Sequence, residues 1–252
     1  MSANELYHPR KSSLKDAIVN FGDFCSGVVV SEEGLVFTNH HCGFNSIQQH
    51  SSLENDYIKN GFIARNRSEE LPNPELYVRF LLRTENVSLR VLKSVRPAMT
   101  EKERAAVVDS VMYIIQNEVS ETDSTLIGIV DAYYSGNEFW LSVYRDFNDV
   151  RLVFAPPSSV GKFGWDTDNW MWPRHTGDFC IFRIYADKNN QPADYSDNNI
   201  PYRPPYVVPI SLEGYEEGSF CMTLGYPGST ERYLSSFGIE EMMNNRNQAI
   251  ID

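Results

Sequence analysis

The sequence has the length and composition of a folded globular protein. It contains 252 residues, 42% of them hydrophobic and 22% charged, which excludes a disordered tail, a collagen-like chain and a coiled coil. Against 34 aspartates and glutamates stand only 22 lysines and arginines, giving a net charge of −12. Because so acidic a surface repels phosphate backbones and anionic lipid, we expect no nucleic-acid partner. The sequence also lacks a run of about 18 apolar residues, so we expect no membrane span.

Short runs rich in Val, Ile, Phe and Tyr dominate the chain, and they are bounded by Gly, Pro, Asn and Asp. Runs of this length and composition are typical of strands in an antiparallel sheet. No linker or change of composition divides them, so one large domain or two closely packed lobes is expected. The predicted fold is mostly β. The predicted strands cover residues 27–30, 35–38, 76–82, 126–132, 139–144, 150–154, 179–185, 206–210 and 220–224.

Three segments follow a helical pattern instead. Residues 101–120 begin after Thr100, which forms a capping-box pattern with Glu103, and apolar residues then recur at helical spacing. Residues 46–60 predict one or two short helices. The last segment, 232–252, is also predicted to be helical.

The four cysteines are too few for a disulfide scaffold, and none forms a Cys-x-x-Cys pair that would suggest structural zinc. Cys25 and Cys42 flank two β-prone runs, and they are equidistant from the centre of a hairpin turn at Glu33 and Gly34. That hairpin would place their sulfurs opposite each other, which favours a disulfide and an oxidising compartment over two buried free thiols. Cys180 and Cys221 fall in predicted core strands, and no local pattern pairs them.

Two histidines, His40 and His41, stand at the predicted end of the second hairpin strand. Adjacent side chains in a strand point in different directions, so we expect only one of them to face a given site. The order Cys-x-Gly, strand, glycine turn, strand, Thr-x-His-His-Cys resembles the segment around the general-base histidine of chymotrypsin-like serine peptidases. In that segment the base directly precedes the bridged cysteine, so the resemblance assigns the role to His41.

A catalytic triad also needs a carboxylate that orients the imidazole and stabilises the imidazolium. Asp178 runs directly into an alternating apolar strand, which is where a chymotrypsin-like order places this residue. The competing carboxylates Asp166 and Asp168 lie in a polar, aromatic-rich loop. The alternative for Asp178 is a turn aspartate after Gly177.

The nucleophile of such a triad is missing from these 252 residues. Serine peptidases of this class hold the serine in a Gly-x-Ser-Gly turn whose N–H groups form the oxyanion hole, and the chain contains no such turn. We therefore expect the chain to be the N-terminal part of a longer enzyme, with its serine beyond residue 252.

Five longer motifs narrow the resemblance. They resemble the bacterial dipeptidyl peptidases of the chymotrypsin clan, of the dipeptidyl-peptidase 7 and 11 type, from about Leu6 to the last residue. The motifs are TNHHCGF at 38–44, APPSSVGKFG at 155–164, DTDNWMWPRHTGDF at 166–179, FRIYAD at 182–187 and GYPGST at 225–230.

The resemblance implies a fold and a location. Members of this group are periplasmic or cell-surface enzymes, possible homodimers, that remove dipeptides from free peptide N-termini without a cofactor. Their chymotrypsin-like double β-barrel is interrupted by a helical domain. Residues 1–231 would then be the N-terminal part of the peptidase domain, an incomplete double barrel with one inserted amphipathic helix, and 232–252 the start of the helical domain.

The resemblance also implies roles for particular residues. His41 corresponds to the general base and Asp178 to its orienting carboxylate. Asn169 and Trp170 correspond to a pair that helps to hold the substrate's N-terminus, and an amide oxygen with an aromatic face suits an ammonium group. Without the resemblance, Trp170 would be read as a core aromatic residue in an irregular loop.

Two alternatives belong to other classes of function. The chain could be a non-catalytic scaffold or peptide-binding module, because a base without a nucleophile cannot form an acyl-enzyme. A metal site built from His40, His41 and His175 is disfavoured, since contiguous histidines seldom converge on one ion and no metal is expected. The preference at the residue before the cleaved bond stays open between acidic and bulky apolar side chains.

Overall fold

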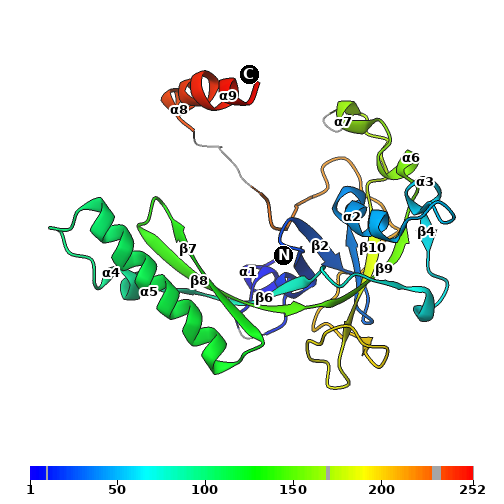
Figure 1. The fold of residues 1–252 in the computed structure, drawn as a ribbon, viewed down its shortest axis with the longest axis horizontal. Coiled ribbons are helices and arrows are strands. Elements are labelled where there is room, and N and C mark those ends of the chain that lie inside the picture. Colours follow the sequence, from blue (N-terminus) through cyan, green and yellow to red (C-terminus); the bar gives the residue numbers. More distant parts are fainter. Residues whose placement is uncertain (10, 169–170, 229–233, 252) are drawn as a thin grey trace.

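A single antiparallel sheet forms the centre of the computed structural model, which describes residues 1–9, 11–168, 171–228 and 234–251 (Figure 1). The strand order is β4-β9-β10-β3-β2-β1-β6-β8-β7, with β11 paired to β10 and β5 to β9. The prediction of a mostly β fold is confirmed. Among the described residues the sheet is open and its end strands β4 and β7 do not pair, so the expected double barrel is not closed here. The strands are β1 (Ile18–Phe21), β2 (Cys25–Val29), β3 (Leu35–Thr38), β4 (Phe62–Ile63), β5 (Leu71–Pro72), β6 (Val78–Asn86), β7 (Leu126–Tyr133), β8 (Glu138–Phe147), β9 (Asp149–Ala155), β10 (Cys180–Ala186) and β11 (Ile200–Pro201).

The helices are mostly short. No helix within the described ranges is both long and apolar enough to cross a bilayer. The α-helices are α1 (Ala3–Leu6), α2 (His40–His50), α3 (Tyr57–Asn60), α4 (Ser88–Leu92), α5 (Glu101–Thr122), α6 (Ser158–Gly161), α7 (Trp165–Asp168), α8 (Ser236–Glu241) and α9 (Asn247–Ile251). Two 3₁₀ turns, η1 (Leu14–Ala17) and η2 (Arg67–Glu69), and a π-helical segment, η3 (Met242–Arg246), complete the set.

Helix α5 confirms the predicted amphipathic helix and its capping box. Thr100 Oγ1 accepts from the backbone N–H of Glu103, while the Glu103 carboxylate accepts from the Thr100 N–H. One stripe of α5 packs on β7 and β8, which extend together from the rest of the sheet as an arm (Figure 1). This arm therefore has an apolar core of its own. Its buried residues are Val87, Val91, Val108, Ile115, Val119, Val130, Phe139, Leu141 and Val143.

Two predicted strands are wrong. Residues 206–210 and 220–224 are described, but neither forms a strand. The first segment reaches the sheet through one backbone bond, from Val208 N to Val29 O at 2.9 Å. An apolar run becomes a strand only where a partner offers its backbone groups. β2 leaves few of them free, because β1 pairs with it from Cys25 to Val28 and β3 with Val28 and Val29.

The predicted hairpin register is also wrong. Val28 pairs with Phe37 and Val29 with Val36, so the hairpin is centred between Glu32 and Glu33, one residue earlier than expected. The Ser31 hydroxyl accepts from the backbone N–H of Glu33 and of Leu35 and so builds a four-residue loop. Local side-chain bonds of this kind compete with a two-residue turn.

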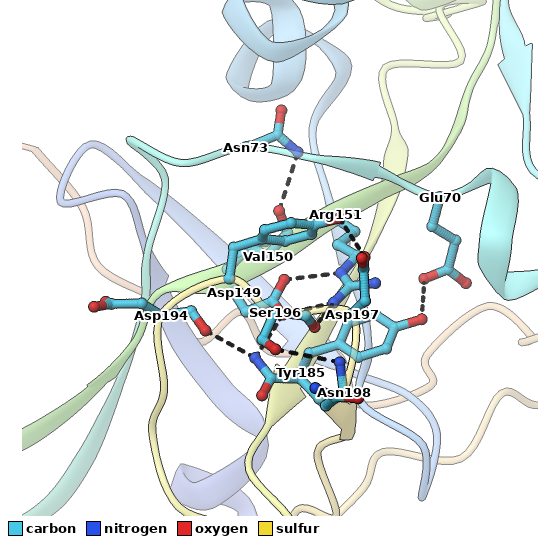
Figure 2. A network of polar contacts seen from close by, with 12 residues as sticks. Glu70, Asn73, Asp149, Val150, Arg151, Tyr185, Asp194, Ser196, Asp197 and Asn198 are labelled. Atoms are coloured by element: carbon cyan, nitrogen blue, oxygen red, sulfur yellow. Dashed lines mark hydrogen bonds and ion pairs between the residues drawn. The ribbon is translucent and has the colours of Figure 1, made fainter.

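A buried polar network ties β9 and β10 to neighbouring loops (Figure 2). Arg151 donates two hydrogen bonds to Asp149, at 2.8 and 2.7 Å, and a third to the carbonyl of Ser196 at 3.0 Å. The hydroxyl of Tyr185 donates to Glu70 at 2.8 Å. Buried charges are tolerated when they are paired in this way, so the network fixes the strand that leads out of the site described next.

Candidate active site

The pairing of β3 with β10 creates the candidate site. Thr38 lies opposite Cys180 in this antiparallel ladder, so the chain that leaves β3 runs beside the chain that enters β10. His41, in the first turn of α2, therefore meets Asp178, two residues before β10. The Nδ1 atom of His41 lies 2.8 Å from Oδ2 of Asp178, across 137 residues of sequence.

The backbone joins this contact as well. The N–H of His41 donates to Oδ1 of Asp178 at 3.1 Å, so both carboxylate oxygens are occupied by one residue. The positive end of the α2 dipole favours a negative charge at this place. Arg174 Nη2 stands 3.7 Å from Oδ2 and adds the positive charge of its guanidinium. The Asp178 side chain is 12% exposed, whereas that of His41 is 67% exposed.

His40 has the opposite environment. Its residue surface is 1% exposed, and its ring packs so closely on α6 that a Cβ added to Gly161 would lie 2.4 Å from it. Burial lowers the pKa of His40, because the charged imidazolium loses its water. As expected, only one of the two histidines faces the cleft of the candidate site. The expected cause, alternation along a strand, is wrong. They do not end a strand; they open helix α2.

A disulfide joins Cys25, at the start of β2, to Cys42, with a Cα–Cα distance of 6.1 Å. The predicted bridge is confirmed, although Cys42 lies in α2 and not opposite Cys25 in a hairpin. Donor atoms of Cys25, His41 and Cys42 come within 4.8 Å of one another. Since both sulfurs are consumed by the bridge, this trio offers a metal ion only an imidazole nitrogen.

The imidazole of His41 opens on a cleft of about 280 Å³. Two hydrogen bonds hold its wall beside Asp178: Gly177 N donates to Val160 O at 3.0 Å, and Thr176 Oγ1 donates to Phe163 O at 2.5 Å. The lining combines the histidine–carboxylate pair with two cations and two aromatic rings. It consists of His41, Gly161, Lys162, Phe163, Trp165, Arg174, Thr176 and Asp178.

The structure describes four of the residues named in the sequence analysis only in part or not at all. Asn169 and Trp170, the predicted substrate-binding pair, lie outside the described residues. The side chains of Asp166 and Asp168, the competing carboxylates, lie outside them too. The role of Asn169 and Trp170 stays a prediction.

The two remaining cysteines differ from each other. Cys180 is a buried free thiol, its Sγ donates to Asn39 O at 3.1 Å, and burial raises its pKa. Cys221 is free but exposed, which contradicts its predicted place in a core strand. It is exposed because residues 220–224 do not join the sheet.

Sequence reasoning missed Asn39 and Arg174, the other side chains that approach the Asp178 carboxylate. Asn39 Nδ2 donates to Asp178 O at 3.1 Å and lies 3.4 Å from its Oδ2. Arg174 precedes Asp178 by four residues, a spacing that is informative only in a helix, and these residues are not helical. An asparagine just before a helix predicts an N-cap. The sequence around Asn39 gives no sign that its side chain contacts a residue 139 positions later.

Comparison with known proteins finds similar sequences and similar structures among dipeptidyl peptidases. The chain is 51% identical to "Dipeptidyl-peptidase 7" of Porphyromonas endodontalis and 49% identical to "Asp/Glu-specific dipeptidyl-peptidase" of Capnocytophaga gingivalis, over 252 residues in both cases. A crystal structure of Porphyromonas endodontalis DPP11 in an alternate conformation matches with a TM-score of 0.90 and 42% identity, covering 100% of this chain and 38% of that one.

The chain spans about a third of the length of these curated relatives, 31% of the first and 35% of the second. A family model described as "Peptidase S46" matches residues 1–252, the whole of the sequence. The fold, the relatives and the family model agree, and the chain belongs to the peptidase S46 family.

Proposed function

We propose that this chain supplies the general base, His41, and its orienting carboxylate, Asp178, to a serine dipeptidyl peptidase. The 2.8 Å contact between His41 Nδ1 and Asp178 Oδ2, beside an open cleft, carries the proposal. The nucleophilic serine would come from a part of the enzyme outside these 252 residues. In this proposal, residues 1–231 are part of the peptidase domain and 232–252 begin a helical domain.

The geometry supports this chemistry. A carboxylate can only accept at neutral pH, so Nδ1 of His41 carries the proton of the 2.8 Å bond. The lone pair is then on Nε2, where it can take the proton of a serine hydroxyl and later return it to the leaving amine. Asp178 would stabilise the imidazolium formed between these steps. The exposed imidazole of His41 suits this role, and the buried imidazole of His40 does not.

The proposed substrates are peptides with a free N-terminus. Relatives are named dipeptidyl-peptidases, and crystal structures of DPP11 from Porphyromonas endodontalis hold a substrate or the dipeptides Arg-Glu and Arg-Asp. In this chain we propose that Asn169 and Trp170 recognise the substrate's ammonium group, through the amide oxygen and the ring face.

The proposed location is the periplasm or the cell surface. The Cys25–Cys42 bridge supports it, because disulfides persist mainly in oxidising compartments. The bridge also fixes α2, and with it the proposed base.

Peptide digestion by the full-length protein tests the proposed function. With matched peptides that carry a free or an N-acetylated terminus, mass spectrometry should find dipeptides released from the free peptide alone. The His41→Gln variant should release none, and the 252-residue chain alone should also be inactive. A full-length protein that binds these peptides without cleaving them would instead support the non-catalytic peptide-binding module.

A further inference from the structure

Asn39 occupies the N-cap position of α2, yet its side chain does not cap the helix. An N-cap asparagine ordinarily accepts a hydrogen bond from the N–H two or three residues later, which satisfies one of the free donors of the first turn. In α2 the N–H two residues later belongs to His41, and Oδ1 of Asp178 accepts it at 3.1 Å. Asp178 therefore performs the capping that Asn39 leaves undone.

The amide of Asn39 is directed to Asp178 instead. Its Nδ2 donates to the backbone oxygen of Asp178 at 3.1 Å and lies 3.4 Å from Oδ2, the oxygen that also faces Nδ1 of His41. Asn39 and Asp178 have thus exchanged partners. The aspartate caps the helix that carries His41, and the asparagine holds the aspartate.

The backbone of Asn39 is itself well fixed. Its carbonyl oxygen accepts from the N–H groups of Cys42 and Gly43, at 3.1 Å each, and from Sγ of Cys180 at 3.1 Å. A Cβ added to Gly43 would lie 2.6 Å from that sulfur, so α2 and β10 pack here with no spare room. The amide of Asn39 accordingly projects from a rigid junction between the two elements that carry His41 and Asp178.

We propose that Asn39 is a positioning residue, which holds the Asp178 carboxylate in the orientation where both of its oxygens serve His41. The inference rests on the proposed function of the His41–Asp178 pair. Asn39 touches no substrate in this role. Its effect on the reaction passes through Asp178, and it should therefore appear in kcat and not in KM.

Two substitutions in the full-length enzyme separate this role from a contribution of Asn39 to the folding of α2. Serine and aspartate are N-cap residues about as good as asparagine, so Asn39→Ser and Asn39→Asp should leave the folded state intact. Neither keeps the amide donor. We expect Asn39→Ser to lower kcat about 10-fold, as for other partners that orient a functional group from behind, and to leave KM within about twofold. Asn39→Asp should lower kcat further, about 100-fold, because it places a second carboxylate against Asp178.

Asn66 provides the matched control. It caps η2 in the ordinary way, its side chain accepting from the N–H of Ser68 at 3.0 Å, and Asn66→Ser should leave kcat unchanged. Values of kcat within twofold of the parent for both Asn39→Ser and Asn39→Asp would overturn the inference and leave the Asn39 side chain without a role in the reaction. Loss of activity in His41→Gln under the same conditions would show that the proposed function stands when the Asn39 inference fails. Retained activity in His41→Gln would overturn both.

Discussion

Two adjacent histidines have different chemistry because helix α2 sends their side chains to different surroundings. His40 faces inward against Gly161, while the His41 imidazole faces the cleft and Asp178. Because the two histidines are consecutive in the sequence, the sequence could not show which of them is buried. That depends on α6, which lies more than a hundred residues further along the chain.

The close contact of Gly161 with His40 predicts a steric effect. A methyl group at Gly161 would lie 2.4 Å from Cδ2 and Cγ of His40, so Gly161→Ala should lower the free energy of unfolding by about 1–3 kcal/mol. His40→Ala in the same chain should relieve part of this loss, which chemical denaturation of the single and double variants would measure. Gly228→Ala is the control, since nothing lies within 4 Å of its added Cβ. If the double variant lost the sum of the two single-variant losses in free energy of unfolding, the contact between Gly161 and His40 would be contradicted.

The lowered pKa of His40 predicts a pH effect on stability. Burial is the main cause; the charges of His41 and Lys162 lower the pKa further, and that of Asp178 opposes them. In the unfolded chain His40 gains a proton below about pH 6.5. In the folded chain it gains that proton only at a lower pH, because its pKa is lowered. The unfolded state then binds more protons, so the free energy of unfolding falls as the pH drops through this range.

The His40→Leu variant isolates this effect. Its free energy of unfolding, measured by denaturant titration from pH 7.5 to 5, should fall less steeply with pH than that of the parent. The difference in slope should correspond to at most one proton bound on unfolding. Identical slopes would mean that His40 is protonated as readily in the folded chain as in the unfolded one.

At the scale of elements, the Cys25–Cys42 bridge joins β2 to the helix that carries His41. It links residues 17 apart in sequence, and closing a loop of this size stabilises a fold by about 3 kcal/mol. The double variant Cys25→Ala/Cys42→Ala should lose a free energy of unfolding of that order. Cys221→Ser should lose almost none, because Cys221 is free and exposed.

Thiol counting on the unreduced, denatured chain provides a direct check. It should find two free thiols, those of Cys180 and Cys221. Four thiols in oxidised, exported protein would contradict the bridge and remove its support for an oxidising compartment.

Elements whose signals are local could be predicted from the sequence. The capping box at Thr100 marked the start of α5 within one residue, and seven of the apolar runs became strands because each found a partner in the sheet. Residues 206–210 and 220–224 carry the same kind of pattern without such a partner. The hairpin register depended on the Ser31 hydroxyl, and the start of α2 at His40 on a cap from Asp178, which is distant in sequence.

The candidate site was predictable for a different reason. His41 and Asp178 lie in motifs that resemble a known group of peptidases. That resemblance singled them out, together with the alternating apolar strand that follows Asp178. The contact itself follows from the pairing of β3 with β10. The role of Asn39 could not be predicted, because a side chain that leaves its own helix uncapped gives no signal in the sequence.

At the scale of the whole molecule, the open sheet separates two apolar cores. One lies under the strands that meet at the site, around Phe21, Phe182 and Ile184, and the other lies in the arm of α5, β7 and β8. The polar network of Arg151 and Tyr185 fixes β9 and β10 from the other face of the sheet (Figure 2), because these two residues alternate along their strands with the core residues Leu152 and Ile184. The site thus rests on rigid strands, as the proposed pairing of His41 with Asp178 for catalysis requires.

The central claim is that Asp178 orients His41 as the base of a dipeptidyl peptidase, and one measurement tests it most directly. It is kcat/KM of the full-length enzyme on a free peptide, for Asp178→Asn against the parent. We expect a fall of about 10⁴-fold, the size seen when the corresponding carboxylate of other serine peptidases is changed to an amide. Asp146→Asn, which alters an aspartate paired with Arg79 in the sheet, should stay within a few-fold of the parent. A value for Asp178→Asn within about tenfold of the parent, in a folded protein, would contradict the account.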